Sequence, residues 1–175
     1  MDDKLEALEQ SVGGRRNFDT PPLHLWHPPL SGDMPVLIKA NGDWYHDDGL
    51  IKREALVRLF ASILRREEDG EYYLVTPAEK WRIKVELLPL MVTDVERNIE
   101  AGEPCLVATL NVGRRITVSE KYPLFLEHAA DDVAAIRLDH GLSALFTRAA
   151  WYRLVEMAEE GSVRSGGIEF SLLPG

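Results

Sequence analysis

The chain has 175 residues, and its 20 lysines and arginines against 29 aspartates and glutamates give a formal net charge of −9. A composition of 45% hydrophobic and 28% charged residues is ordinary for a folded soluble protein and excludes disorder of the whole chain. The acidic balance argues against general binding to nucleic acids or membranes. The one cysteine, Cys105, excludes a disulfide framework and a cysteine-based zinc site.

The sequence also carries no membrane or export signal. No apolar run reaches the roughly 18 residues that a transmembrane helix needs. The first residues, Met1-Asp2-Asp3-Lys4, lack the basic and apolar regions of a secretory signal. We therefore expect a cytoplasmic protein without a transmembrane segment.

The first 35 residues predict a helix followed by a proline-rich strap. Apolar residues at spacings of three and four predict a short amphipathic helix over 3–12 within an N-terminal arm, 1–18. Five of the ten prolines then fall in 19–35, which disfavours regular structure there. Because Leu23 and Trp26 are apolar, we expect this segment to lie on the core; a polyproline motif for a partner is the alternative.

An α+β pattern follows. Asn41-Gly42 between two apolar runs predicts a hairpin, a one-sided apolar stripe predicts a helix over 53–67, and Tyr72 begins a strand that ends in a tight turn over 76–79. Strict alternation predicts a strand from Trp81 onward. Beyond it we expect strands at 91–96, 105–110, 115–119, 124–128 and 134–138. A second helix is expected at 147–160 and a last strand at 168–173.

The second helix repeats the first when the sequence is shifted by 95 residues. Arg53 then meets Arg148 and Arg58 meets Arg153, and each helix has a hairpin before it and a strand after it. This predicts duplicated hairpin–helix–strand units on antiparallel sheets, an N-terminal half over 19–78 and a C-terminal β-rich half with one helix over 79–175. Chance similarity of two amphipathic helices is the alternative.

Several stretches resemble a bacterial, proteobacterial family of unknown function. The resemblance covers most of the chain from about Trp26 to Leu154, is most distinctive from Thr76 to Trp81, and weakens around 161–167. It is carried by the residues 41–46, 51–53, 59–66, 69–77, 79–81 and 111–113. The resemblance implies a duplicated core, a C-terminal half superficially like a pleckstrin-homology fold, a ligand site where the halves meet, a nucleotide-like ligand and a role in signal transduction.

The residues themselves offer scattered candidates for ligand contacts. No Walker, dinucleotide-binding, zinc-protease or serine-hydrolase motif is present. Arg53 and Arg148 are expected in the first turn of their helices, where a cation opposes the helix dipole. Each therefore either pairs with a carboxylate such as Asp43, Asp47 or Asp139, or holds an anion together with the helix N-terminus.

The remaining candidates surround the distinctive run. Thr76 and Glu79 bound its turn, and Lys80 lies on a basic strand face that is either solvated or turned to a cleft. Trp81 is expected in the core, where its indole N–H borders a site in the functional interpretation. Asn111 lies in a turn whose backbone N–H groups either close the turn alone or also bind an anion.

Three functions remain open. The first is a non-catalytic regulatory protein that binds a nucleotide-like or other anionic small molecule at the interface between the halves, in bacterial signal transduction. The second is a protein–protein interaction module without a small-molecule ligand, which rests on the strap and the N-terminal helix. The third, an enzyme with Glu79, Asp94 and Glu96 as acid–base groups, is disfavoured because nothing pairs them. No cofactor or metal is expected.

Overall fold

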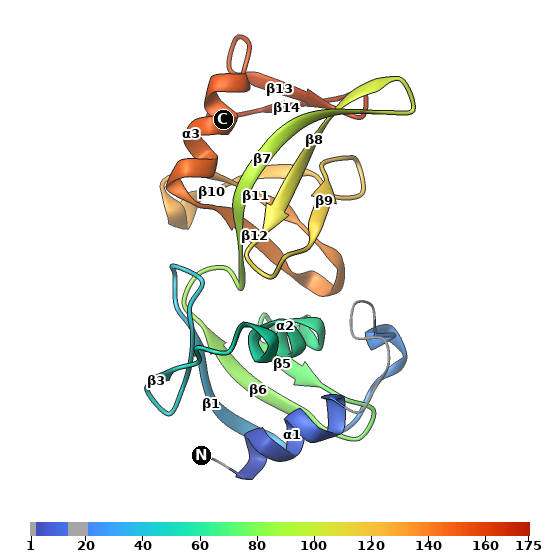
Figure 1. Ribbon diagram of the computed structural model, residues 1–175, viewed down its shortest axis with the longest axis vertical. Helices are drawn as coiled ribbons and strands as arrows, with labels where there is room; N and C mark the ends of the chain where they lie inside the picture. The colour runs from blue at the N-terminus through green and yellow to red at the C-terminus, as the bar shows by residue number, and fades with distance from the viewer. Residues whose placement is uncertain (1–2, 14–20) are drawn as a thin grey trace. The chain divides into compact units, whose positions relative to one another are not determined.

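The computed structural model describes residues 3–13 and 21–175 and divides the chain into two units, Met1–Glu86 and Leu87–Gly175 (Figure 1). Each unit contains a six-stranded sheet, so the expected α+β class with duplicated halves is confirmed. The expected arm over 14–18 and the start of the strap at 19–20 lie outside the described residues. None of the helices within the described ranges has the length and apolar character needed to span a bilayer.

The N-terminal unit is a sheet with the strand order β3-β2-β1-β6-β5-β4. All neighbouring strands are antiparallel except β1 and β6, which are parallel. Its elements in chain order are α1 (Asp3–Gly13), η1 (Leu23–Leu25), β1 (Gly32–Ile38), β2 (Trp44–His46), β3 (Gly49–Leu50), α2 (Glu54–Ser62), β4 (Leu64–Arg66), β5 (Tyr72–Val75) and β6 (Lys80–Val85).

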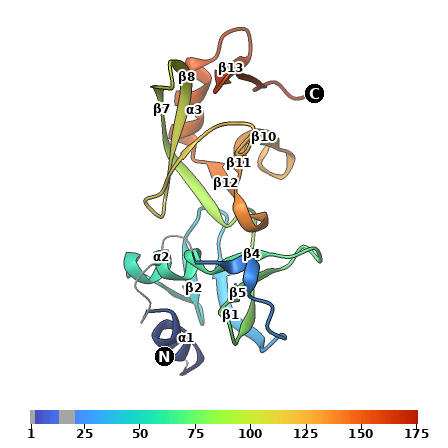
Figure 2. The same cartoon turned by 90° about the vertical axis from the view of Figure 1, so that its right-hand side faces the viewer.

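The short N-terminal helix is docked, as its length requires. Leu5 and Leu8 are buried, and α1 contacts α2 (Figure 2). The face of α2 turned to the core carries Leu56 and Phe60. The predicted Asn41-Gly42 hairpin joins β1 to β2 as expected, with Gly42 in the left-handed region at φ 93°.

The helix predicted over 53–67 is wrong at its C-terminal end. Helix α2 ends at Ser62, and the apolar residues Ile63 and Leu64 are buried from its C-cap and from the first position of strand β4 instead. Strand β4 pairs with β5 through the Asp69-Gly70 turn, so the sheet supplies the hydrogen bonds that the last helical turn would have made. The strap differs too, because β1 already begins at Gly32; Leu23 is buried, while Leu25 is 67% exposed.

The C-terminal unit has the strand order β10-β11-β12-β7-β8-β9, again antiparallel except for the central pair, β12 and β7. A two-stranded sheet of β13 and β14 follows its helix. The elements in chain order are β7 (Leu90–Glu100), β8 (Glu103–Leu110), β9 (Arg115–Thr117), β10 (Leu124–Glu127), η2 (His128–Ala130), β11 (Val133–Arg137), η3 (Asp139–Gly141), β12 (Ser143–Phe146), α3 (Arg148–Met157), β13 (Ser162–Ser165) and β14 (Ile168–Ser171).

The duplication is visible in the sheets. In each unit two three-stranded meanders are joined by a parallel pair made of the first and the last strand of the six. The helices take different places, since α2 lies between the meanders and α3 follows the second one. Strand β4, which follows α2, therefore belongs to a six-stranded sheet. Strands β13 and β14, which follow α3, form the small sheet instead.

The boundary between the units lies after Glu86, past the expected boundary at 78, because β6 pairs with both β5 and β1. The strands predicted in the C-terminal half are all present, and the second helix ends earlier than predicted, at Met157. The hairpin expected before the second helix is formed by β11 and β12, although no range was predicted for β12, and β13 was not predicted. Every residue of β12 is buried, so its short sequence shows no alternation of apolar and polar residues.

Candidate functional site

Arg53 is not in the first turn of α2 but is its N-cap residue, with extended backbone. Its Nη2 atom lies 3.1 Å from Oε1 of Glu9 on α1. The carboxylate that pairs with this arginine is therefore Glu9, and neither Asp43 nor Asp47 takes that role. The bond links the two helices of the N-terminal unit.

Thr76 and Glu79 close a tight turn between β5 and β6, as predicted. The Thr76 N–H donates to the Glu79 carbonyl oxygen at 2.9 Å, and Oγ1 of Thr76 accepts from the Ala78 and Glu79 N–H groups at 3.3 and 3.0 Å. Thr76 is buried. Its hydroxyl holds the turn. The segment from Thr76 to Trp81, where the family resemblance is most distinctive, therefore has a structural role.

Lys80 belongs to a charged cluster of Arg65, Glu67 and Lys80 on one face of this sheet. Nζ of Lys80 donates to Oε1 of Glu67 at 2.9 Å and lies 4.7 Å from the centroid of the Tyr73 ring. Arg65 donates to Oε2 of Glu67, and through Nη1 to the carbonyl oxygens of Leu23 and Trp26 at 2.9 and 2.8 Å. Burial alone would raise the pKa of Glu67, but the hydrogen bonds from Lys80 and Arg65 hold it below its ordinary value. The cluster therefore fastens the strap to the sheet.

A second set of polar side chains continues across the same face. Arg65, Tyr73, Arg82 and Asp33 are neighbours in register on β4, β5, β6 and β1. Arg82 donates to Asp33 at 2.5 Å, and the Tyr73 hydroxyl donates to Asp69 at 2.5 Å, which raises the tyrosine pKa. The expected basic face thus carries its own carboxylates, which neutralise its cations.

Trp81 has its side chain in the core, as predicted, with 9% of its surface exposed. A methyl group added at Gly32 on the neighbouring strand would meet the Trp81 ring at 3.3 Å. The glycine therefore gives the indole its space. Packing against Gly32 therefore explains the position of the Trp81 side chain.

The other two candidates, Asn111 and Arg148, belong to the C-terminal unit. Oδ1 of Asn111 accepts from the Met91 N–H at 3.1 Å, and its own N–H donates to the Met91 carbonyl at 2.9 Å. Its side chain therefore closes the turn after β8 onto β7. Arg148 is exposed and is the first residue of α3, after the N-cap Thr147, whose hydroxyl accepts from the Ala150 N–H.

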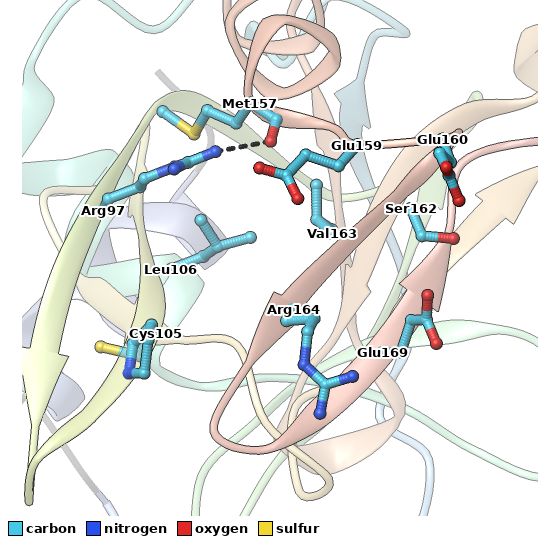
Figure 3. A pocket seen from close by; sticks show the side chains of 11 residues that line it. Arg97, Cys105, Leu106, Met157, Glu159, Glu160, Ser162, Val163, Arg164 and Glu169 are labelled. Atoms are coloured by element: carbon cyan, nitrogen blue, oxygen red, sulfur yellow. Dashed lines mark hydrogen bonds between the residues drawn. The ribbon is translucent and has the colours of Figure 1, made fainter.

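A pocket that the sequence did not predict lies within the C-terminal unit (Figure 3). It has a volume of about 560 Å³ and lies among β7, β8, the end of α3 and the β13–β14 hairpin. That volume falls in the range of small-molecule sites, about 300–1,000 Å³. Its lining residues are Arg97, Pro104, Cys105, Leu106, Met157, Glu159, Glu160, Ser162, Val163, Arg164 and Glu169.

The pocket exists because one buried serine holds β13 beside β8. Oγ of Ser165 accepts from the Leu106 N–H at 2.8 Å and donates to the Val118 carbonyl at 2.6 Å. The Gly166 N–H donates to the Pro104 carbonyl at 3.1 Å. These bonds place the apolar side chains of Leu106 and Val163, both buried, at the floor of the pocket.

Charged side chains stand around this floor. Nη2 of Arg97 donates to the Met157 carbonyl oxygen at 2.6 Å. Nη2 of Arg164 lies 3.4 Å from the Gly167 carbonyl, a long contact for a guanidinium. Figure 3 shows the Glu159 carboxylate turned toward the Arg97 guanidinium. Among the ion pairs of the described residues, none joins two residues that line this pocket.

Cys105 lines the pocket and is buried. Burial, and the charge of Glu100, raise the pKa of its thiol. The neutral thiol is therefore the form present at neutral pH, and it is a poor nucleophile. Within 3–13 and 21–175 no group of three or more His, Cys, Asp or Glu side chains is arranged to hold a metal ion.

None of the pocket residues was a sequence candidate. They come from segments far apart in the chain, and Ser165 lies 59 residues from its partner Leu106. The sequence feature that could have pointed to this pocket is the glycine pair at 166–167, which forms the turn between β13 and β14. This turn lies where the family resemblance weakens.

Comparison with known proteins places both units in one family. Residues 21–87 match the model of the N-terminal domain of DUF1285, a domain of unknown function, and residues 89–172 match the model of the C-terminal domain of the same family. No curated protein matches the chain.

Two crystal structures of family members resemble the chain. A DUF1285 family protein from Silicibacter pomeroyi DSS-3 is 35% identical over 95% of this chain and 94% of that protein, with a TM-score of 0.83. One from Shewanella baltica OS155 is 33% identical over 70% of this chain and 91% of that protein, with a TM-score of 0.59. The chain thus belongs to the DUF1285 family, a bacterial family of unknown function with a duplicated core.

Proposed function

We propose that this chain is a non-catalytic binding protein whose small-molecule ligand, bearing an anionic group, occupies the pocket of the C-terminal unit. The observation that carries the proposal is the pairing of an apolar floor, Leu106 and Val163, with two arginines that line the same pocket. A guanidinium binds carboxylate and phosphate groups through two parallel hydrogen bonds. Apolar contact with the floor adds affinity for the rest of the ligand.

Binding rather than catalysis is supported by the state of the reactive groups. Cys105 is buried as a neutral thiol. Of the acid–base candidates, Asp94 lies 3.3 Å from Nη1 of Arg153, and Glu96 pairs with Arg115. In each ion pair a guanidinium engages one of the oxygens that proton transfer would need.

A regulatory role in bacterial signal transduction belongs to this proposal and rests on the family resemblance. A cytoplasmic location belongs to it as well. The nucleotide-like ligand that the resemblance implies is one of the anionic classes that the scan below tests. The ligand site predicted from the sequence at Arg53, Thr76, Glu79, Lys80, Trp81, Asn111 and Arg148 stays a prediction. Arg53→Ala and Arg148→Ala test it, because normal ligand binding by both variants would exclude these arginines.

A thermal-shift scan of the full chain tests the proposed function. The ligands are nucleotides, phosphometabolites, amino acids and dipeptides, each at low and moderate salt. A ligand at 100 times its Kd stabilises the folded state by about 2.7 kcal/mol, which is several degrees for a chain of this size. The shift should disappear in the double variant Arg97→Gln/Arg164→Gln.

The matched control is Arg153→Gln, which removes an exposed arginine of the same unit outside the pocket. It should keep the full shift. A shift that survives in the double variant, or a scan without a shift for any ligand class, would overturn the proposal.

A protein–protein interaction module is the second candidate function, and the strap favours it. Leu25 and Leu30 are 67% and 45% exposed, next to the half-buried Trp26. Exposed leucines next to an aromatic side chain offer an apolar surface that a partner could cover. Replacing both leucines by serine should then weaken capture of a partner, and an unchanged pull-down would exclude this surface.

A further inference from the structure

We infer that the pocket of the C-terminal unit takes a zwitterion, a ligand with a carboxylate, a protonated amine and an apolar middle, such as an amino acid or a dipeptide. The inference deepens the proposed function and rests on it. A zwitterion differs from a polyanion such as a nucleotide because it carries one charge of each sign.

The charge balance of the lining is the first argument. Two arginines, Arg97 and Arg164, face three glutamates, Glu159, Glu160 and Glu169. The lining is therefore negative by one formal charge. A polyphosphate would bring several negative charges next to three exposed carboxylates, and like charges at short range repel each other, most strongly at low salt. A ligand that carries one charge of each sign meets no such repulsion.

The arrangement of the charges is the second argument. At one end Glu159 points toward Arg97 (Figure 3), and at the other Arg164 and Glu169 oppose each other in the register of β13 and β14. Neither pair is close enough to form an ion pair in the described structure. Each end therefore presents both a guanidinium and a carboxylate to a ligand.

The distance between these ends is bridged by an apolar floor. Leu106 and Val163 line the pocket with buried apolar side chains between its charged residues, and Ser162 adds a hydroxyl (Figure 3). A single amino acid with an apolar side chain, or a dipeptide of such residues, matches this order of charge, apolar surface and charge.

The limited donor capacity of the arginines is the third argument. A guanidinium has five N–H donors, and Arg97 already commits Nη2 to the Met157 carbonyl. The remaining edge is enough for one carboxylate in a bidentate contact. A chain of phosphates needs many more donors than one such edge offers, and the Walker-type loop that usually supplies them is missing from the sequence.

The test uses isothermal titration calorimetry on the full chain with L-leucine, leucyl-leucine and two blocked forms of the dipeptide. N-acetyl-leucyl-leucine lacks the amine charge, and leucyl-leucine amide lacks the carboxylate. ATP and pyrophosphate serve as polyanions. We expect the dipeptide to bind and each blocked form to bind at least about tenfold more weakly, since each loses one charged contact.

Two variants assign the contacts to the pocket. Arg97→Gln should weaken leucyl-leucine and leave the amide form unchanged, while Glu169→Gln, at the other end of the floor, should weaken leucyl-leucine and leave the acetylated form unchanged. Arg153→Gln should leave the affinity of every probe unchanged.

The outcomes separate the inference from the proposed function. If ATP or pyrophosphate binds and depends on Arg97 while the zwitterions do not bind, the zwitterion is excluded and the binding function stands. If blocked and unblocked dipeptides bind equally, the charged contacts are excluded. If no probe binds, both the inference and the pocket as a binding site are overturned.

Discussion

Arg97 on β7 donates a hydrogen bond of 2.6 Å to the carbonyl oxygen of Met157, the last residue of α3. Carbonyl groups in the last turn of a helix lack partners within the helix and carry the negative end of its dipole. A guanidinium at this position satisfies one of them and ties the helix end to the long β7–β8 hairpin. The same side chain lines the pocket, so the packing of α3 and the charge of the pocket depend on one residue.

Arg97→Gln should lower the free energy of unfolding by about 1 kcal/mol, because one charged hydrogen bond at an exposed helix end is lost. Urea unfolding of the two proteins measures the difference. Arg153→Gln is the control, since its half-exposed ion pair with Asp94 should contribute less than the Arg97 bond to the helix end. A stability equal to that of the wild type would mean that the Arg97 bond does not secure the helix end.

Ser165→Ala should cost about 1–3 kcal/mol, because it leaves the buried Leu106 N–H and the Val118 carbonyl without their partner. It should also abolish ligand binding in the pocket, since β13 is no longer held beside β8. Ser171→Ala on β14 removes a hydroxyl whose bonds to Leu173 are exposed, so it should cost much less and leave binding unchanged. Loss of stability with unchanged binding would show that the pocket does not need this anchor.

Arg65→Gln should lower the free energy of unfolding by about 2–3 kcal/mol, because three partners lose a charged donor: the carbonyls of Leu23 and Trp26, and Glu67. Cleavage of the strap by a protease should become faster. Arg58→Gln, whose partner Glu54 is exposed and 3.9 Å away, should cost less than about 0.5 kcal/mol. Equal proteolysis of both variants would contradict the role of Arg65 in fastening the strap.

The stability of the protein should fall in acid through Glu67. Its pKa is lower in the folded state than its ordinary value of 4.5, so the folded state binds this proton less readily than the unfolded state. The contribution is fully present above pH 4.5 and is lost as the pH falls through the folded pKa. In urea unfolding over this range, Glu67→Gln should show a weaker pH dependence than the wild type, and an identical dependence would exclude Glu67 as a source.

Local patterns predicted much of the fold. The alternation from Trp81 onward and the Asn41-Gly42 pair led directly to β6 and to the β1–β2 hairpin. The end of α2 was missed because Ile63 and Leu64 satisfy an apolar stripe in a helix and burial just beyond the helix end equally well. The pairing of β4 with β5 decides between them, and a helical stripe contains no information on that pairing.

The candidate site was predicted less well. Thr76 and Glu79 were assigned to their turn correctly because the turn is local in sequence. The partner of Arg53 was missed because Glu9 comes from a separate helix. The pocket was missed for the same reason, since it depends on Ser165 reaching Leu106 across a long stretch of chain.

An NMR titration of the full, ¹⁵N-labelled chain with leucyl-leucine tests the central claim most directly, because it locates the binding site residue by residue. We predict that the largest changes fall on the backbone amides of Leu106, Val163 and Arg164, and that they are absent in Arg97→Gln/Arg164→Gln. Changes centred on Thr76 to Trp81 or on Asn111, or a spectrum without changes, would contradict the assignment of the pocket.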